Sequence, residues 1–267
     1  MIIAKIIFLL TSALLLSLAQ AQQLNFQAIP LENPQFMFRE LRPFLDSLEK
    51  KTGFSINYKT SADYTETLEN IARGEVDFAL LSATTFLIAR EKAGFRVLAE
   101  LQFEQSPQYR SVIIVREDSG IDSLAQLKGK NFVFGSRLST SNALLPKYML
   151  LKAGLKLSAL KSYRYLHHHN QVVLSVLNGR FDAGGVRKRV AEPYTKYGLK
   201  YLSVSQPLPN FCIAYHPRIN KRTLEKLRRA LMQLRIQNSY FDYFYPAGDH
   251  LYDSIKKIKK YVQENEN

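Results

Sequence analysis

Residues 64–83 read YTETLENIARGEVDFALLSA, and residues 169–188 read HNQVVLSVLNGRFDAGGVRK. The two stretches repeat one pattern at an offset of 105 residues: a polar start, a short helical segment, a glycine and an apolar strand. The clearest matches are Gly74 with Gly179 and Asp77 with Asp182. A helix, a glycine and a strand also follow one another by chance in many chains. If the repeat is structural, it predicts two α/β lobes that each contain this unit.

On either side of the repeat, the chain alternates short apolar runs with helical patterns, which favours an α/β fold. Strands are expected at 24–29, 54–58, 76–81, 110–116 and 131–135. Helices are expected at 37–48, 65–73, 121–127, 142–153, 172–178 and 224–234. Gly53, Gly74, Gly154 and Gly179 follow four of these helices, as glycines at helix ends commonly do.

The repeat also predicts where a ligand would bind. In an open α/β sheet, ligands bind at the carboxyl ends of the strands. The repeat places Tyr64 and His169 at equivalent loop positions, one in each lobe. Ser82 and Arg187 are related in the same way. Two such sheet edges facing each other would form a cleft.

The segment 132–142, FVFGSRLSTSN, reads as a strand, a polar loop and the start of a helix. Ser139, Thr140 and Ser141 fall at the helix start, where backbone N–H groups are unpaired and the helix dipole is positive. Hydroxyls and amides together make a seat for a tetrahedral oxyanion. The alternative is an ordinary helix N-cap, which Ser and Thr also favour.

Other candidate chemistry in the chain is weak. His167-His168-His169 resembles a metal-binding tract, but neighbouring residues in a loop rarely converge on one ion, and no Cys, Asp or Glu cluster accompanies them. A single histidine donating to an oxyanion is favoured instead. Cys212, the only cysteine, lies in an apolar run and is expected to be buried and inert. No catalytic motif is present, so we expect no enzyme, no metal site and no cofactor.

Composition limits the classes of protein further. The chain has 267 residues, 46% of them hydrophobic, and a formal net charge of +14 from 37 Lys+Arg and 23 Asp+Glu. Such a chain has enough apolar residues for folded cores and is not intrinsically disordered. Nucleic-acid binding is not expected, because the basic residues are scattered over helix faces, as at Lys221-Arg222 and Lys256-Lys257. The positive field would still attract anions to a cleft.

The first 21 residues have the features of an export signal. Lys5 precedes an apolar run from Ile6 to Leu18, and Ala19-Gln20-Ala21 fits a cleavage site after Ala21. A membrane anchor is the alternative, although the run is short for a bilayer span. No cysteine lies near the site, so lipid attachment there is not expected. We therefore expect a soluble exported, periplasmic protein.

Taken together, these segments resemble the phosphate/phosphite/phosphonate periplasmic substrate-binding proteins of ABC transporters. The likeness runs from about residue 60 to about residue 190. It is carried by Asp63-Tyr64, RGEVD at 73–77, YRSVIIVREDSGI at 109–121, LAQLKGK at 124–130, STS at 139–141, His169 and VLNGRFDAG at 176–184. The resemblance implies a type II-like periplasmic-binding-protein fold, in which two α/β lobes are hinged by two crossing strands and close over a ligand.

The resemblance also implies site residues and a ligand class. Tyr64 and Tyr109 would bind phosphoryl oxygens from one side of the cleft, and Ser139, Thr140, Ser141 and His169 from the other. The chain departs from the family pattern at Arg187, where an acidic residue is common, and at Asn170, where an acidic residue is frequent. It also has Leu81-Ser82-Ala83-Thr84 where a glycine often follows the strand. These departures disfavour an aminoalkylphosphonate and favour an inorganic oxyanion or an acidic organophosphonate.

Ser82 and Arg187 are expected near the cleft mouth, on opposite lobes. An arginine there would attract oxyanions and repel an ammonium group. The alternative places Arg187 with Lys188 and Arg189 on a solvated surface.

The expected organisation is a signal peptide at 1–21, a first lobe from 22–111 with 207–267, and a second lobe at 112–206. The crossing strands would be 110–116 and 211–216. The function expected first is a monomeric receptor that delivers a phosphorus oxyanion to an inner-membrane ABC permease. The alternatives are a sensory subunit for a membrane kinase or cyclase, and an exported enzyme acting on a phosphorylated compound.

Overall fold

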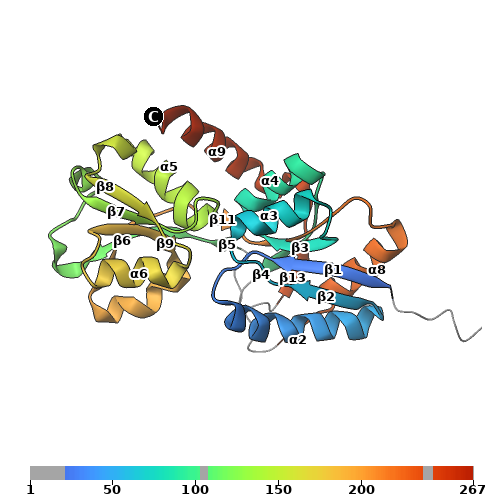
Figure 1. Ribbon diagram of the computed structural model, residues 1–267. Coiled ribbons are helices and arrows are strands. Elements are labelled where there is room, and N and C mark those ends of the chain that lie inside the picture. Colours follow the sequence, from blue (N-terminus) through green and yellow to red (C-terminus); the bar gives the residue numbers. More distant parts are fainter. Residues whose placement is uncertain (1–21, 103–107, 237–242, 267) are drawn as a thin grey trace, which may run out of the picture.

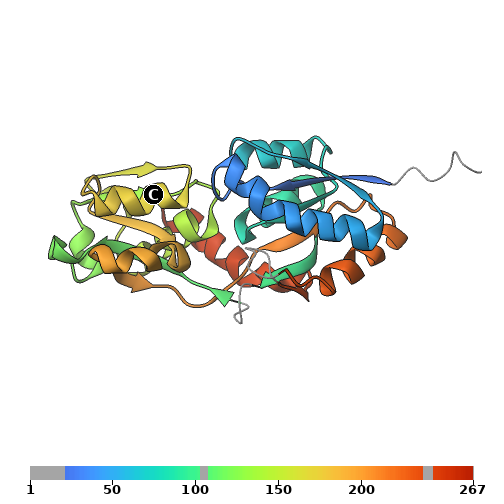
Figure 2. The ribbon, with the colours of Figure 1, turned by 90° about the horizontal axis from the view of Figure 1, so that it is seen from below.

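The computed structural model describes residues 22–102, 108–236 and 243–266. The proposed signal peptide, residues 1–21, lies outside these described residues. Figures 1 and 2 show two α/β lobes side by side, each built around its own β-sheet. The two-lobe α/β fold expected from the sequence is therefore confirmed.

Lobe 1 is the lobe built on the six-stranded sheet, whose strand order is β13-β4-β12-β3-β1-β2. Its strands are β1 (Gln23–Ala28), β2 (Ser55–Lys59), β3 (Phe78–Leu81), β4 (Arg96–Gln102), β12 (Cys212–Tyr215) and β13 (Tyr243–Pro246). Its helices are α2 (Pro34–Thr52), α3 (Tyr64–Ala72), α4 (Ala83–Ala93), α8 (Lys221–Met232), the 3-10 turn η6 (Asp249–Tyr252) and α9 (Asp253–Asn265). Phe26, Phe44 and Phe78 pack together in its core, with ring centroids 4.8 and 5.9 Å apart.

Lobe 2 is the lobe built on the five-stranded sheet, whose strand order is β10-β6-β9-β7-β8. Its strands are β6 (Ser111–Arg116), β7 (Asn131–Phe134), β8 (Ser162–Tyr165), β9 (Ala183–Arg187) and β10 (Leu199–Val204). Its helices are α5 (Leu145–Lys152), α6 (His169–Leu177) and α7 (Lys188–Ala191), with a π-helical turn η3 (Thr140–Leu144) before α5. Its 3-10 turns are η1 (Glu117–Ser119), η2 (Leu124–Leu127), η4 (Leu157–Ala159) and η5 (Glu192–Tyr197).

The sequence repeat corresponds to a repeated arrangement of strands. β1 is parallel to β2 and β3, and β7 is parallel to β8 and β9 in the same way. An antiparallel strand follows in each lobe: β12 pairs with β3 in lobe 1, and β6 pairs with β9 in lobe 2. Asp77 accepts a hydrogen bond from the backbone N–H of Asn25 at 2.7 Å, and Asp182 accepts one from Asn131 at 2.7 Å. The two aspartates therefore stabilise equivalent strand pairs and are not cleft residues.

The connection between the lobes differs in detail from the expected one. Segments 110–116 and 211–216 were expected to cross between the lobes, but β6 lies within the lobe 2 sheet and β12 within the lobe 1 sheet. Both are almost wholly buried apolar strands, which require neighbours on both sides within a sheet. The crossing is made just before each of them, where β5 (Gln108–Tyr109) pairs antiparallel with β11 (Leu208–Pro209).

The C-terminal helix α9 also bridges the lobes. It starts beside α4 of lobe 1 and runs across the junction to α5 of lobe 2 (Figures 1 and 2). At its far end, Lys147 of α5 forms an ion pair with Glu266 at 2.5 Å. The Tyr148 ring meets the edge of Tyr261 at a centroid distance of 5.4 Å. The lobes are therefore joined by α9 as well as by β5 and β11.

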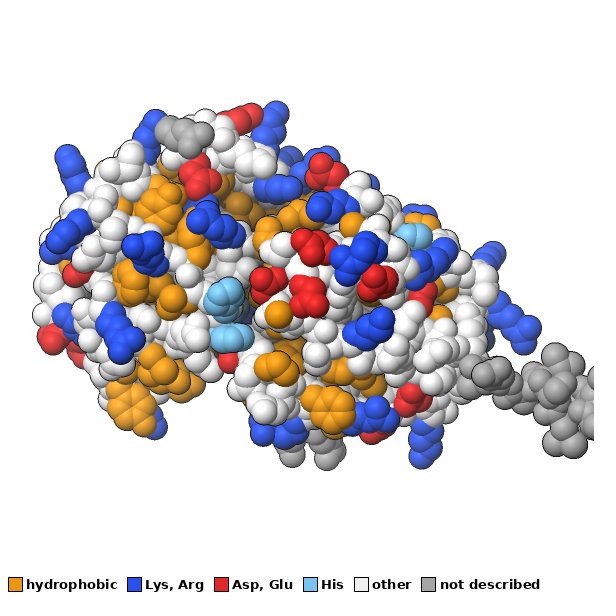
Figure 3. Space-filling view, in the orientation of Figure 1, with side chains coloured by type: hydrophobic (Ala, Val, Ile, Leu, Met, Phe, Trp, Pro, Cys, Tyr) orange, Lys and Arg blue, Asp and Glu red, His pale blue; other side chains and the backbone are white. Residues whose placement is uncertain are grey.

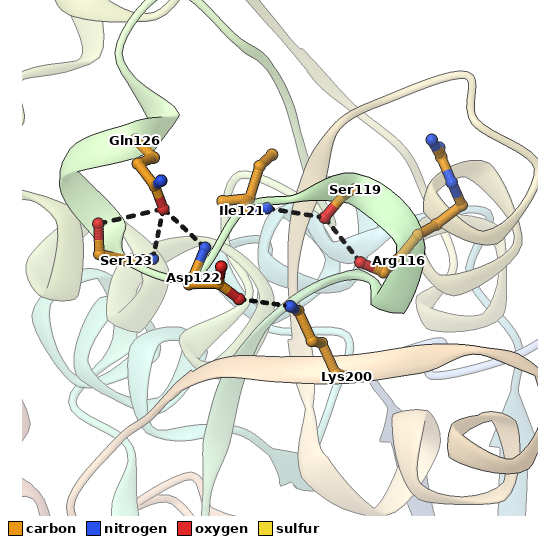
Figure 4. A network of polar contacts seen from close by, with 7 residues as sticks. All are labelled: Arg116, Ser119, Ile121, Asp122, Ser123, Gln126 and Lys200. Carbon is orange, nitrogen blue, oxygen red and sulfur yellow. Dashed lines mark hydrogen bonds and ion pairs between the residues drawn. The ribbon is translucent and has the colours of Figure 1, made fainter.

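The family-like segment 116–127 has a structural role in lobe 2 (Figure 4). The Ser119 hydroxyl donates to the Arg116 carbonyl at 2.7 Å, and Gln126 Oε1 accepts from the backbone N–H of Asp122 at 2.7 Å. Lys200 of β10 pairs with Asp122 at 2.7 Å. These contacts close the loop at the carboxyl end of β6. The segment therefore shapes the lobe and supplies none of the predicted binding residues.

Replacing Asp182 by Ala should destabilise the protein by about 1.5–3 kcal/mol, because the N–H of Asn131 loses a charged acceptor. Asp182→Asn, which keeps an acceptor oxygen, should cost less. Urea unfolding measures both changes. Asp118→Ala is the control, since that side chain is 79% exposed. An Asp182→Ala protein as stable as the control would contradict this role.

Candidate ligand-binding site

The predicted site residues lie where the two lobes meet. Ser82 follows β3 in lobe 1, Arg187 ends β9 in lobe 2, and η3 follows β7. The lobes are in direct contact at this point: the Thr140 Oγ1 of η3 accepts from the backbone N–H of Thr84 at 2.9 Å and lies 2.9 Å from the Thr84 hydroxyl. The carboxyl ends of these strands and the starts of these helices therefore face one another where the lobes meet, and we call this region the interlobe cleft.

All eight predicted binding residues are buried, although each carries a polar group. They are Tyr64, Ser82, Tyr109, Ser139, Thr140, Ser141, His169 and Arg187. Burying a polar group without a hydrogen-bond partner is costly, so a polar cluster between two lobes normally indicates a ligand or an internal network. The contacts of each residue distinguish these roles.

The Ser139–Thr140–Ser141 segment forms the first turn of the helix after β7. The Ser139 hydroxyl accepts from the backbone N–H of Asn142 at 3.2 Å, so Ser139 does act as an N-cap. Ser141 donates to the Asn142 side chain at 3.2 Å. The first turn is a π-helix, a local distortion that is frequent at functional sites. N-capping therefore uses one acceptor of Ser139 and not its hydroxyl proton, whereas the Ser141 hydroxyl already donates to Asn142.

Close packing holds this turn against the lobe 2 sheet. A Cβ atom on Gly135 would lie 2.5 Å from the Cβ of Asn142, and one on Gly185 would lie 2.2 Å from Pro146. Only glycine at both positions lets η3 and α5 approach the strands this closely. Asn142, which the sequence did not single out, also accepts from the backbone N–H of Arg187 at 3.2 Å. It thereby links the hydroxyl turn to the end of β9.

Tyr109 comes to the cleft from the crossing strand β5. Its hydroxyl interacts with the side chains of Thr140 and Ser141. Burial raises the pKa of Tyr109 to about 12, an effect that nearby Arg187 only partly offsets. The phenol therefore stays protonated and remains a hydrogen-bond donor near neutral pH. Tyr64, the first residue of α3, is buried in lobe 1 directly after the N-cap Asp63.

His169 is the first residue of α6 and is 6% exposed. Burial, with a smaller contribution from the charges of Arg187 and His168, lowers its pKa to about 3. The imidazole is therefore neutral and can donate one hydrogen bond. Its buried Nε2 has no hydrogen-bond partner among the described residues.

Arg187 is 2% exposed, which excludes the solvated surface that was its alternative position. Its guanidinium carbon lies 4.7 Å from the ring centroid of Tyr109 and 5.1 Å from that of Phe211. Nη2 donates to Asn210 Oδ1 at 3.4 Å. The cation thus lies at the crossing segments and close enough to His169 to affect its pKa. Ser82 is less available, because its hydroxyl caps α4 through Thr85.

Other candidates in the chain do not form sites. Among the described residues, no three His, Cys, Asp or Glu side chains are arranged to hold a metal ion. Burial raises the pKa of Cys212 to about 12, so its thiol is not reactive. No helix in the described ranges is long and apolar enough to cross a membrane. Figure 3 shows Lys and Arg side chains spread over both lobes on this face, without a single basic patch.

Two α/β lobes joined by a double crossing, with buried polar groups between them, are the architecture of a periplasmic-type substrate-binding protein. The chain belongs to the family described as the phosphonate periplasmic substrate-binding proteins of ABC transporters, whose model matches residues 26–263. Its role is to bind a small ligand for an ABC transporter, and the family is periplasmic. The relatives found are binding proteins rather than enzymes.

Two curated relatives are similar over most of the chain. The phosphonates-binding periplasmic protein of Escherichia coli K12 is 29% identical over 244 residues, which cover 85% of this chain and 72% of that protein. A probable phosphite-binding protein of Prochlorococcus marinus is 26% identical over 211 residues, covering 73% and 70%.

Solved structures share the fold. The binding component of a phosphonate transporter from Pseudomonas aeruginosa has a TM-score of 0.81 at 22% identity, covering 92% of this chain and 88% of that one. A P. marinus protein in complex with methylphosphonate also has a TM-score of 0.81, at 21% identity, covering 91% and 99%.

The neutral state of His169 has a measurable consequence. In the unfolded chain its imidazole takes up a proton near pH 6.5, but in the folded protein only near about 3. Its contribution to stability is therefore present above pH 6.5 and is lost as the pH falls below that value, by up to about 1.4 kcal/mol per pH unit. The unfolding free energy of the wild type, relative to His169→Gln, should decrease from pH 6 to pH 4. Urea titrations measure it, with exposed His250→Gln as control; a constant difference would refute a neutral, buried His169.

Proposed function

We propose that this protein captures a phosphorus oxyanion (phosphate, phosphite or a phosphonate) in the interlobe cleft and presents it to an inner-membrane ABC permease. The observation that carries the proposal is the meeting of buried donors from both lobes. Thr140 lies at the lobe contact, buried His169 Nε2 has no partner within the described part of the chain, and Arg187 provides a buried cation. Tetrahedral anions match several convergent donors of this kind. The phosphite- and phosphonate-binding relatives support the same ligand class.

Within this proposal each residue has a role. The hydroxyls of Ser139, Thr140 and Ser141 and the phenols of Tyr64 and Tyr109 donate to phosphoryl oxygens. Neutral His169 donates one further hydrogen bond, and Arg187 supplies the charge. Ser82 shapes the lobe 1 side mainly by starting α4.

The remaining expectations are part of the same proposal. The lobes comprise 22–111 with 207–267, and 112–206, and the receptor acts as a monomer after cleavage following Ala21. A permease is preferred to a membrane sensor as the partner because the family serves ABC transporters. The proposal assigns no catalytic step to the cleft.

Thr140→Val should weaken binding of a confirmed phosphorus ligand by roughly 1–3 kcal/mol, which is about fivefold to more than a hundredfold. The substitution keeps the side-chain shape but removes the hydroxyl, which accepts from the Thr84 N–H at the lobe contact and, in this proposal, donates to the ligand. Ser139→Ala should weaken binding in the same direction. Calorimetry measures the affinities, and exposed Thr195→Val is the matched control. Unchanged affinity in both cleft variants would reject the assignment.

Arg187 should determine the choice between ligands. In Arg187→Asp, the affinity ratio of 2-aminoethylphosphonate to methylphosphonate should rise by roughly tenfold, because an ammonium group is no longer repelled. Arg187→Gln is the milder variant if the buried aspartate destabilises the fold, and thermal unfolding checks both. If neither variant changes the ratio, Arg187 does not select the ligand.

A further inference from the structure

A groove of about 560 Å³ lies at the outer edge of the interlobe cleft. Its lobe 1 wall is the segment leading into α2, and its lobe 2 wall comes from α6, α7 and η5. In Figure 3 the lower edge of the molecule is indented between the two lobes. The volume is within the usual range for small-molecule sites. None of the binding roles described above uses this groove.

The start of α6 and its contact with lobe 1 form the partition between the groove and the predicted binding residues. On α6, His169 is buried at the cleft, and the next residue, Asn170, lines the groove. Asn170 Nδ2 donates to Glu32 Oε1 across the lobes at 3.2 Å. A ligand substituent that reaches from the predicted binding residues into the groove must displace this contact.

The contact between Glu32 and Asn170 in this partition is a single hydrogen bond to a neutral amide. Burial raises the pKa of Glu32, so its carboxylate is destabilised in this position. Turning the carboxylate toward water would relieve that cost. Displacing it with a ligand substituent is therefore less costly than breaking a strong ion pair.

The lining of the groove is aromatic and mostly cationic. Phe36 and Tyr194 supply ring surface from opposite lobes, and Arg189 and Lys196 supply positive charge. Lys196 Nζ lies 5.1 Å from the ring centroid of Tyr197 at the exposed rim. Two cations against one carboxylate favour an anionic group, and the rings favour a planar, apolar body.

We infer that the groove accommodates the organic substituent of a phosphonate whose phosphoryl group is held in the cleft, and that an aromatic substituent ending in a carboxylate is the best match. This inference rests on the proposed function. Small ligands such as phosphate or methylphosphonate would be enclosed without reaching the groove. The protein would then accept both small oxyanions and larger acidic organophosphonates at one site.

The test compares three ligands that share one head group: methylphosphonate, phenylphosphonate and 4-phosphonobenzoate. Calorimetry gives their affinities for the wild type, Lys196→Met and Tyr194→Leu. The control is Lys161→Met, which removes an exposed cation of lobe 2 that does not line the groove. Thermal unfolding checks that each variant is folded.

Lys196→Met should weaken the affinity for 4-phosphonobenzoate by about threefold to fivefold, as expected for the loss of a partly exposed ion pair. It should leave phenylphosphonate and methylphosphonate within about twofold. Tyr194→Leu should weaken both aromatic ligands and spare methylphosphonate. The control should leave all three affinities within about twofold.

Two results would overturn the inference and leave the proposed function in place. One is that the wild-type protein binds methylphosphonate but binds neither aromatic ligand. The other is that the groove variants weaken the binding of all three ligands equally, or weaken the binding of none of them. If the wild type binds none of the three, and neither phosphate nor phosphite, the proposed function fails and the inference fails with it.

Discussion

The hydrogen bonds between Thr84 and Thr140 mark the constraint on which the rest of the structure depends. They join the start of α4 in lobe 1 to the first turn after β7 in lobe 2, so two helix starts face each other with little water between them. Helix starts carry unpaired N–H groups and a positive dipole end. Bringing them together is electrostatically unfavourable unless an acceptor lies between them. Under the proposed function, an anion bound in the cleft would supply that acceptor, and lobe closure and ligand binding would stabilise each other.

The connections between the lobes limit how that closure can occur. The chain crosses at β5 and β11, where the paired segments are only two residues long, and α9 forms a third link on α5. Tyr252, just before α9, donates to the carbonyl of Asn210, and the side chain of Asn210 in turn accepts from Arg187. Separation of the lobes must therefore break the contacts of α9 with α5 or carry α9 along with lobe 2. Asn210 therefore contacts both Arg187 at the cleft and Tyr252 at the start of α9. The positions of these two side chains depend on the same hinge geometry.

Local sequence signals predicted much of this architecture. The repeat identified α3 and α6 with their glycines, and three polar residues after β7 identified the hydroxyl turn. The sequence predicted one helix over 142–153, but the structure has the π-helical turn η3 followed by α5. The close contacts of Gly135 and Gly185 with this segment are nonlocal, so local sequence patterns do not predict them. Helices α4 and α9 and strands β4, β8, β10 and β13 were not anticipated. Neither Thr84 nor the Glu32–Asn170 contact has a sequence signature, because each depends on how the lobes dock.

Arg187 and His169 show how the charge of one side chain acts on a second side chain of the candidate site. Arg187 lies at the end of β9, and its charge adds to burial in lowering the pKa of His169. The pair therefore carries a positive charge on the guanidinium and a neutral imidazole with one donor and one acceptor nitrogen. An aspartate at 187 would act in the opposite direction: it would remove the cation and favour protonation of the neighbouring imidazole. The negative charge of that carboxylate could then balance a ligand ammonium. An arginine is a permanent cation, so under the proposed function the cleft would favour ligands that carry negative charge.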